Sequence, residues 1–113
     1  MSRDEASYVA DMVEACARVI EYTRGIDPAS LRSDIKTVDA VVRNLQILGE
    51  AAKRVSAHVR ASASDVPWRE IAGMRDVLVH DYFGIDLDVV ADVAFGKVPS
   101  LHSRLAARAA RRP

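Results

Sequence analysis

Cysteine is almost absent from this chain of 113 residues, and the sequence patterns that commonly bind metals do not occur. The single cysteine, Cys16, lies within an apolar pattern, which predicts a small core residue in a reducing compartment. There is no His-x3-His, Cys-x2-Cys or Glu-x-x-His pair, and the acidic residues are interspersed with basic ones. We therefore expect chemistry that uses neither a metal ion nor another cofactor.

Aromatic side chains, net charge and long apolar runs are also scarce. Only 5% of residues are aromatic while 50% are hydrophobic, a balance that suits packed helices better than a β-sandwich. The formal net charge is zero, so any RNA binding must come from local clusters of basic residues. No apolar run approaches the roughly 18 to 20 residues of a membrane span, and the N-terminus lacks a signal-peptide core. We expect a cytoplasmic protein.

Apolar residues that recur every three or four positions predict an all-α fold. The predicted helices cover about residues 4–24, 34–61, 67–83, 86–96 and 99–105. Gly49 and Ala52 in the second helix would let a facing helix approach closely. Short connections imply antiparallel neighbours. The prediction is one domain, residues 1–113, folded as an up-and-down antiparallel helical bundle of four main helices plus a short C-terminal helix.

Three side chains suited to phosphate chemistry lie in one otherwise apolar run, residues 73–84. Arg75 is a permanent cation with a planar fork of donors, His80 can carry a proton near neutral pH, and Tyr82 offers a hydroxyl. On an ideal helix His80 would lie about 140° from Arg75, while Tyr82 would return to the face of Arg75. Asp76, four residues before His80, is expected to share its face and orient its imidazole.

Cleavage of RNA by its own 2′-hydroxyl is a reaction that such groups can catalyse. It needs a base for the hydroxyl proton, an acid for the departing 5′-oxygen and a cation for the charge on the phosphorane. Histidine suits the first two roles and a guanidinium the third. A homodimer that brings both copies of Arg75 and His80 to one cleft would supply the second histidine. His58 and His102 lie on polar stripes and are expected to be surface residues.

Arg75, His80 and Tyr82 fit the pattern Arg-x4-His-x-Tyr, and here the chain resembles the HepT-like proteins of the HEPN superfamily. The resemblance runs over nearly the whole chain, from the first residue to about Leu105. Three further segments that resemble the family are residues 39–54, 66–71 and 83–86.

The resemblance implies a homodimeric, metal-independent endoribonuclease that acts as the toxin of a prokaryotic type VII toxin–antitoxin pair, with transfer RNA as an expected target. It implies Arg75 as phosphate binder and transition-state stabiliser, and His80 as general acid or base. It also implies that a minimal nucleotidyltransferase, the antitoxin, adenylylates Tyr82. The added adenylate would compete with RNA phosphate for Arg75 and block the cleft.

Two other interpretations stay open at this point. The chain could be a non-catalytic partner that presents nucleotide or RNA to the nucleotidyltransferase, or a dimerisation bundle with a degenerate site. From spacing alone, Arg75 could pair with a carboxylate such as Asp76, Asp81 or Glu50. Trp68 is expected to anchor the core.

Overall fold

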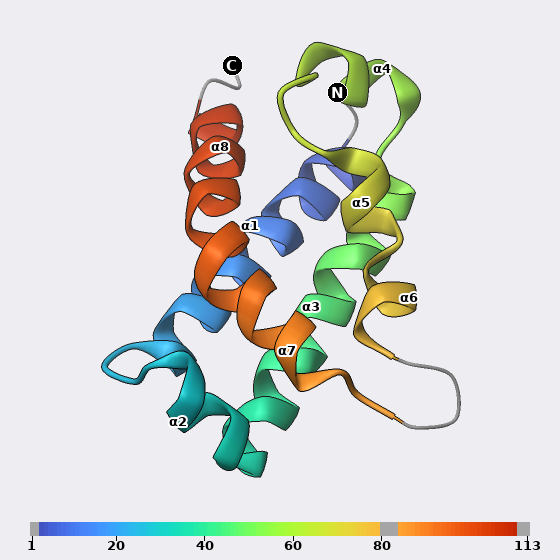
Figure 1. Cartoon of the computed structure of the whole chain (residues 1–113). Coiled ribbons are helices and arrows are strands. Elements are labelled where there is room, and N and C mark those ends of the chain that lie inside the picture. The colour runs from blue at the N-terminus through green and yellow to red at the C-terminus, as the bar shows by residue number, and fades with distance from the viewer. Residues whose placement is uncertain (1–2, 80–83, 111–113) are drawn as a thin grey trace.

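The protein is an all-α bundle in this computed structural model, which describes residues 3–79 and 84–110 (Figure 1). The described helices are α1 (Arg3–Thr23), α2 (Pro28–Ser33), α3 (Ile35–Arg54), α4 (Ala57–Ser62), α5 (Trp68–Ala72), α6 (Met74–Leu78), α7 (Leu87–Ala91), the π-helical turn η2 (Asp92–Lys97) and α8 (Val98–Ala110). Within this part of the chain, none of the helices combines the length and the apolar character that crossing a membrane requires.

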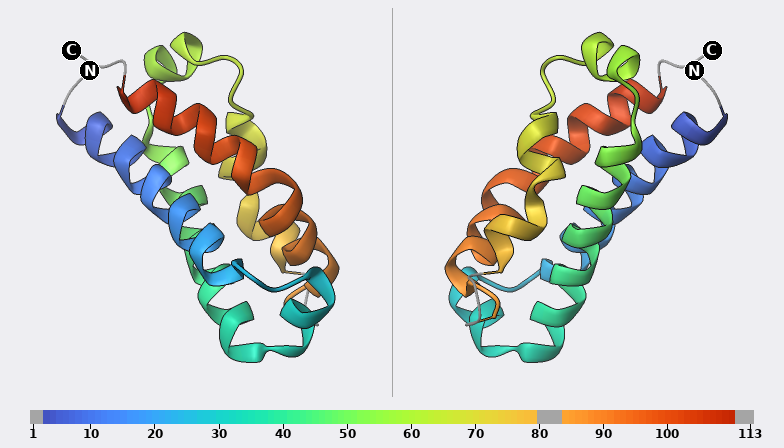
Figure 2. Two further views of the ribbon diagram at one scale, coloured as in Figure 1. Left: turned by 90° about the vertical axis from the view of Figure 1, so that its left-hand side faces the viewer. Right: turned by 90° about the vertical axis from the view of Figure 1, so that its right-hand side faces the viewer.

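The described helices form four stretches that run alternately up and down the bundle (Figure 2). α1 and α3 pack side by side in opposite directions, α5 and α6 return along α3, and α7, η2 and α8 run back beside α1. The start of α1 and the end of α8 therefore lie at one end of the bundle, near α4, while α2 lies toward the other. This is the predicted up-and-down antiparallel arrangement.

A single apolar core runs along the bundle. Met12 of α1, Leu45 of α3 and Leu105 of α8 have no exposed surface, so three of the four stretches meet in one core. Trp68 is 8% exposed, and its indole N–H donates a hydrogen bond of 3.0 Å to the carbonyl oxygen of Ala63. The predicted role of Trp68 as a core anchor is confirmed.

Cys16 also belongs to this core. It has no exposed surface, and burial raises the pKa of its thiol to about 12. Since the thiolate is the reactive form of cysteine, the folded protein holds this side chain in its unreactive form near neutral pH. Cys16 is thus the small core residue that the apolar pattern predicted.

The second predicted helix, residues 34–61, is two helices. At Val55 the backbone is extended, with φ −73° and ψ 133°, and this ends α3. Ser56 then caps α4, because its hydroxyl oxygen accepts a hydrogen bond of 3.2 Å from the N–H of Val59. The apolar periodicity continues through this break, so periodicity alone could not locate it.

The predicted stop at Gly96 is wrong. Both Asp92 and Val98 have right-handed helical backbone angles, so α7, η2 and α8 form one continuous helical stretch. The short C-terminal helix is therefore the end of the fourth stretch. Pro99 has no N–H and its ring conflicts with the carbonyl of Phe95 in a regular α-helix. The wider π turn directly before Pro99 relieves that conflict within the helix.

Candidate functional site

The described part of the predicted site is α6, which carries Arg75 and Asp76. Both side chains are exposed, and neither forms a hydrogen bond or ion pair with another described residue. Arg75 thus pairs with neither Asp76 nor Glu50. His80 and Tyr82 lie outside the described residues, so the roles expected of them stay predictions.

The helical geometry expected between the motif residues does not hold. α6 ends at Leu78; Val79 is extended, with φ −107° and ψ 123°, and forms an isolated antiparallel bridge with Ile85. The angles of an ideal helix therefore stop applying before His80 is reached. The helix that was expected to carry both Asp76 and His80 therefore ends before His80, and the expected role of Asp76 in orienting His80, which lies outside the described residues, stays a prediction.

A glycine of α3, Gly49, sets how closely α5 and α6 pack against α3. We call α5 and α6 the motif helices. A Cβ atom at Gly49 would lie 2.9 Å from the carbonyl oxygen of Ile71 and 3.2 Å from Cβ of Met74. The backbone of α3 therefore comes nearer to α5 and α6 than any side chain at this position would allow. The predicted close approach at Gly49 is confirmed. Because Met74 is the neighbour of Arg75, this contact fixes where the guanidinium leaves the bundle surface.

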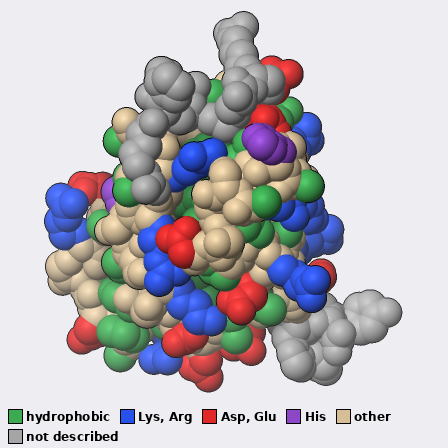
Figure 3. Space-filling view, turned by 90° about the horizontal axis from the view of Figure 1, so that it is seen from above, with side chains coloured by type: hydrophobic (Ala, Val, Ile, Leu, Met, Phe, Trp, Pro, Cys, Tyr) green, Lys and Arg blue, Asp and Glu red, His purple; other side chains and the backbone are tan. Residues whose placement is uncertain are grey.

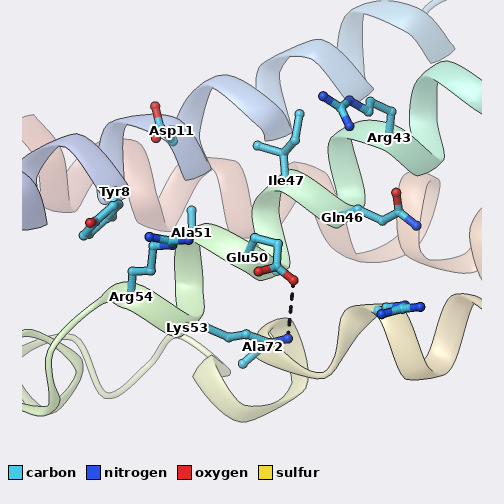
Figure 4. A pocket seen from close by; sticks show the side chains of 12 residues that line it. Tyr8, Asp11, Arg43, Gln46, Ile47, Glu50, Ala51, Lys53, Arg54 and Ala72 are labelled. Carbon is cyan, nitrogen blue, oxygen red and sulfur yellow. Dashed lines mark hydrogen bonds and ion pairs between the residues drawn. The ribbon is translucent and has the colours of Figure 1, made fainter.

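Arg75 lines a groove of about 580 Å³ between α1, α3 and the motif helices (Figure 4). The floor is the outward-facing side of α3, and the walls come from α1 on one side and from α5 and α6 on the other. The lining residues are Tyr8, Asp11, Arg43, Gln46, Ile47, Gly49, Glu50, Ala51, Lys53, Arg54, Ala72 and Arg75. We call this the α1–α3 groove.

The polar side chains of the α1–α3 groove differ in how firmly they are engaged. Lys53 Nζ lies 3.4 Å from Oε1 of Glu50 in an ion pair across one turn of α3. The guanidinium of Arg54 lies over the ring of Tyr8, 5.9 Å from its centroid. Figure 4 shows this stacked pair at one end of the groove and Arg43 toward the other. The groove therefore presents cationic groups along its length.

The opposite side of α6 faces a second, more apolar hollow of about 730 Å³ between α5, α6, η2 and α8. Met74 and Val77 of α6 line it, and Val77 is 52% exposed. Since Arg75 lines one hollow and Val77 the other, α6 separates a polar groove from an apolar one.

The other two histidines are not part of the lining of either hollow. His58 is exposed, as predicted, and His102 is half-buried; neither lines the groove beside Arg75 nor the apolar hollow. Over residues 3–79 and 84–110, no three His, Cys, Asp or Glu side chains come close enough together to hold a metal ion. Of the three residues of the Arg-x4-His-x-Tyr pattern, Arg75 is the one that lies among the described residues.

Comparison with known proteins adds to this geometry. A family model described as ribonuclease HepT-like matches residues 12–107. A protein of Thermococcus cleftensis named as a probable ribonuclease HepT is 38% identical, over 92% of this chain and 94% of its own. Provisionally named RNases of Caldanaerobacter subterraneus subsp. tengcongensis and Methanocaldococcus jannaschii are 36% and 34% identical, covering 87% and 88% of this chain and 88% and 91% of theirs. No solved structure gives a significant match.

The matched residues contain most of the bundle. They include all of α3, which forms the floor of the α1–α3 groove, and all of α6 with Arg75. The family model therefore covers the motif together with the scaffold that carries it, and the relatives align over almost their full lengths. This chain belongs to the HepT-like ribonuclease family.

Proposed function

We propose that the protein is a metal-independent endoribonuclease that cuts RNA in a cleft formed by two protomers. The observation that carries this proposal is the position of Arg75 in a chain of a ribonuclease family. Its guanidinium is exposed, forms no ion pair with a described residue and lines a groove with other cationic groups. A guanidinium in that situation is available to bind a phosphate in a two-pronged contact.

In the proposed reaction, His80 of one protomer takes the proton from the 2′-hydroxyl of a nucleotide. The 2′-oxygen attacks the neighbouring phosphorus, and the bond from phosphorus to the 5′-oxygen breaks. The partner's His80, in its protonated form, gives a proton to the departing 5′-oxygen. Arg75 stabilises the charge that builds up on the phosphorane. The products carry a 2′,3′-cyclic phosphate and a 5′-hydroxyl.

The test is cleavage of a labelled single-stranded RNA by the purified protein in the presence of a chelator. We expect the rate to be unchanged by EDTA and to fall by about 10²- to 10⁴-fold in His80→Ala, because a general acid or base contributes that much. His58→Ala is the matched control, since His58 is exposed and lies outside both hollows. Cutting that stops in EDTA, or persists in His80→Ala, contradicts the proposal.

We further propose that the protein is the toxin of a type VII toxin–antitoxin pair, with transfer RNA as its expected target. A minimal nucleotidyltransferase would neutralise it by adenylylating Tyr82. The adenylate brings a negative phosphate and a bulky base to the motif, where it competes with RNA for Arg75.

Co-expression with a minimal nucleotidyltransferase tests this regulation. We expect mass spectrometry to find adenylate on Tyr82 and cleavage to be lost, whereas Tyr82→Phe should stay active beside the same transferase. If the transferase silences Tyr82→Phe as completely as the parent, inhibition works by binding and the modification mechanism is wrong.

A non-catalytic role remains the competing candidate, and the length of the α1–α3 groove favours it. The groove also contains Arg54, which is stacked on Tyr8 at one end of it. A cation at that place would bind an anionic ligand without taking part in the chemistry. In that role the chain would present RNA or a nucleotide to the transferase. It would then bind RNA but leave it intact in the chelator experiment.

A further inference from the structure

The arginines whose side chains the structure describes fall into two sets. Six have guanidinium groups engaged by a carboxylate, a backbone carbonyl or a hydroxyl: Arg18, Arg24, Arg32, Arg60, Arg104 and Arg108. The guanidinium groups of the other four form no hydrogen bond or ion pair with a described residue: Arg43, Arg54, Arg69 and Arg75. Three of these four, all except Arg69, line the α1–α3 groove. The guanidinium groups that the fold leaves unpaired are therefore concentrated in one place.

The charge of the groove differs from that of the whole chain. Besides the three arginines it is lined by Lys53, while the carboxylates among its described lining residues are Asp11 and Glu50. Four cations against two carboxylates leave a net charge of +2 on the described lining of the groove, although the chain as a whole is neutral. By contrast, basic and acidic side chains are interspersed over the end of the bundle seen in Figure 3. An anionic ligand is attracted to the groove and not to the molecule in general.

The spacing of the cations suits a chain of phosphates. Arg43 and Arg54 stand eleven residues apart on α3, which places them about 16 Å apart along the axis and within about 20° on the same face. They flank the groove floor far enough apart to contact different phosphates of one extended strand. The ring of Tyr8, half-buried in the wall, adds an aromatic group next to Arg54. Cations along a groove with an aromatic side chain are the features that bind single-stranded nucleic acid without base readout.

We propose that the α1–α3 groove binds the single strand of RNA that flanks the scissile phosphate, with Arg43 and Arg54 on its phosphates. This inference rests on the proposed function, which places the scissile phosphate at Arg75, and extends the binding site along α3. A protein partner fits the groove less well, because protein interfaces have a core poor in charged groups. The hollow that contains Val77 offers more apolar surface than the groove does.

The test measures binding separately from cleavage. Fluorescence anisotropy of a labelled mixed-sequence RNA of twenty nucleotides is recorded with full-length His80→Ala protein, which leaves the probe intact. Adding Arg43→Gln and Arg54→Gln should raise Kd by about tenfold or more and reduce the slope of log Kd against log salt by about 1.4, or about 0.7 for each lost phosphate contact. Arg18→Gln with Arg24→Gln is the matched control with equal charge loss, and its Kd should stay within about twofold of the parent.

A variant that adds a positive charge to the groove is expected to bind RNA more tightly, a result that a loss of folding cannot produce. Gln46 lies on the groove floor one turn from Arg43, so Gln46→Lys should tighten RNA binding and steepen the salt dependence. Equal Kd values for the Arg43/Arg54 variant and its control overturn the inference. The inference is also overturned if the Arg43/Arg54 variant binds RNA like the parent but no longer forms a homodimer or no longer binds the nucleotidyltransferase, since the groove would then be a protein interface. Failure to cut RNA leaves these outcomes unaffected, because cutting tests the proposed function alone.

Discussion

Replacing Arg75 by alanine is expected to lower the rate of RNA cleavage by about 10²- to 10³-fold, the usual cost of removing a group that stabilises transition-state charge. The same substitution should leave the stability of the fold unchanged. Arg75 is exposed and forms no ion pair or side-chain hydrogen bond with a described residue, so its removal breaks no contact of the described bundle. Initial rates on labelled RNA and the midpoint of urea unfolding are the two measurements.

The bundle supplies a close control for this substitution. Arg69 is likewise exposed and unpaired among the described residues, but it lines the apolar hollow. Arg69→Ala should therefore cut RNA at close to the parental rate. Arg75→Lys should recover only part of the activity, because an ammonium is a point charge and cannot make the two-pronged contact. An unchanged rate in Arg75→Ala, or an equal loss in Arg69→Ala, would remove Arg75 from the mechanism.

Much of the bundle could be predicted because its helices have regular apolar faces. The first helix was expected over residues 4–24 and spans Arg3–Thr23. The close approach at Gly49 was also predicted, because a glycine on a wide apolar face of a helix has no side chain to keep a facing helix away. Such features depend on local periodicity and side-chain size, both of which the sequence states directly.

The end of α6 could not be predicted in this way. The apolar run around Val77 and Leu78 suits a helix as well as an extended segment, and nothing local decides between them. The decision comes from residues after the motif. Gly84 has a φ of +85°, and the N–H of Asp86 donates a 2.8 Å hydrogen bond to the carbonyl of Leu78. That contact forms only when the returning chain is in place, so the relative placement of the motif residues was beyond sequence reasoning.

Gly49→Ala is expected to destabilise the protein by about 1 to 3 kcal/mol, the usual range for an overpacked core. Alanine gains about 1 kcal/mol over glycine from helix propensity alone. The added Cβ would nevertheless lie only 2.9 Å from the carbonyl oxygen of Ile71, a backbone atom that cannot rotate away as a flexible side chain would. The overlap should outweigh the propensity gain, and urea unfolding extrapolated to water measures the difference.

The matched control is Gly96→Ala, where a Cβ meets only Oδ1 of Asp92 at 3.5 Å. With no overlap to offset it, helix propensity should raise stability there by up to about 1 kcal/mol.

Gly49→Ala should also slow RNA cleavage under conditions where the protein is fully folded, because pushing α5 and α6 away from α3 displaces Arg75 with them. An alanine at 49 that is tolerated without loss of stability would mean that α3 does not hold the motif helices in place. If Gly49→Ala instead loses activity without losing stability, the separation of α3 and α6 matters to catalysis in its own right.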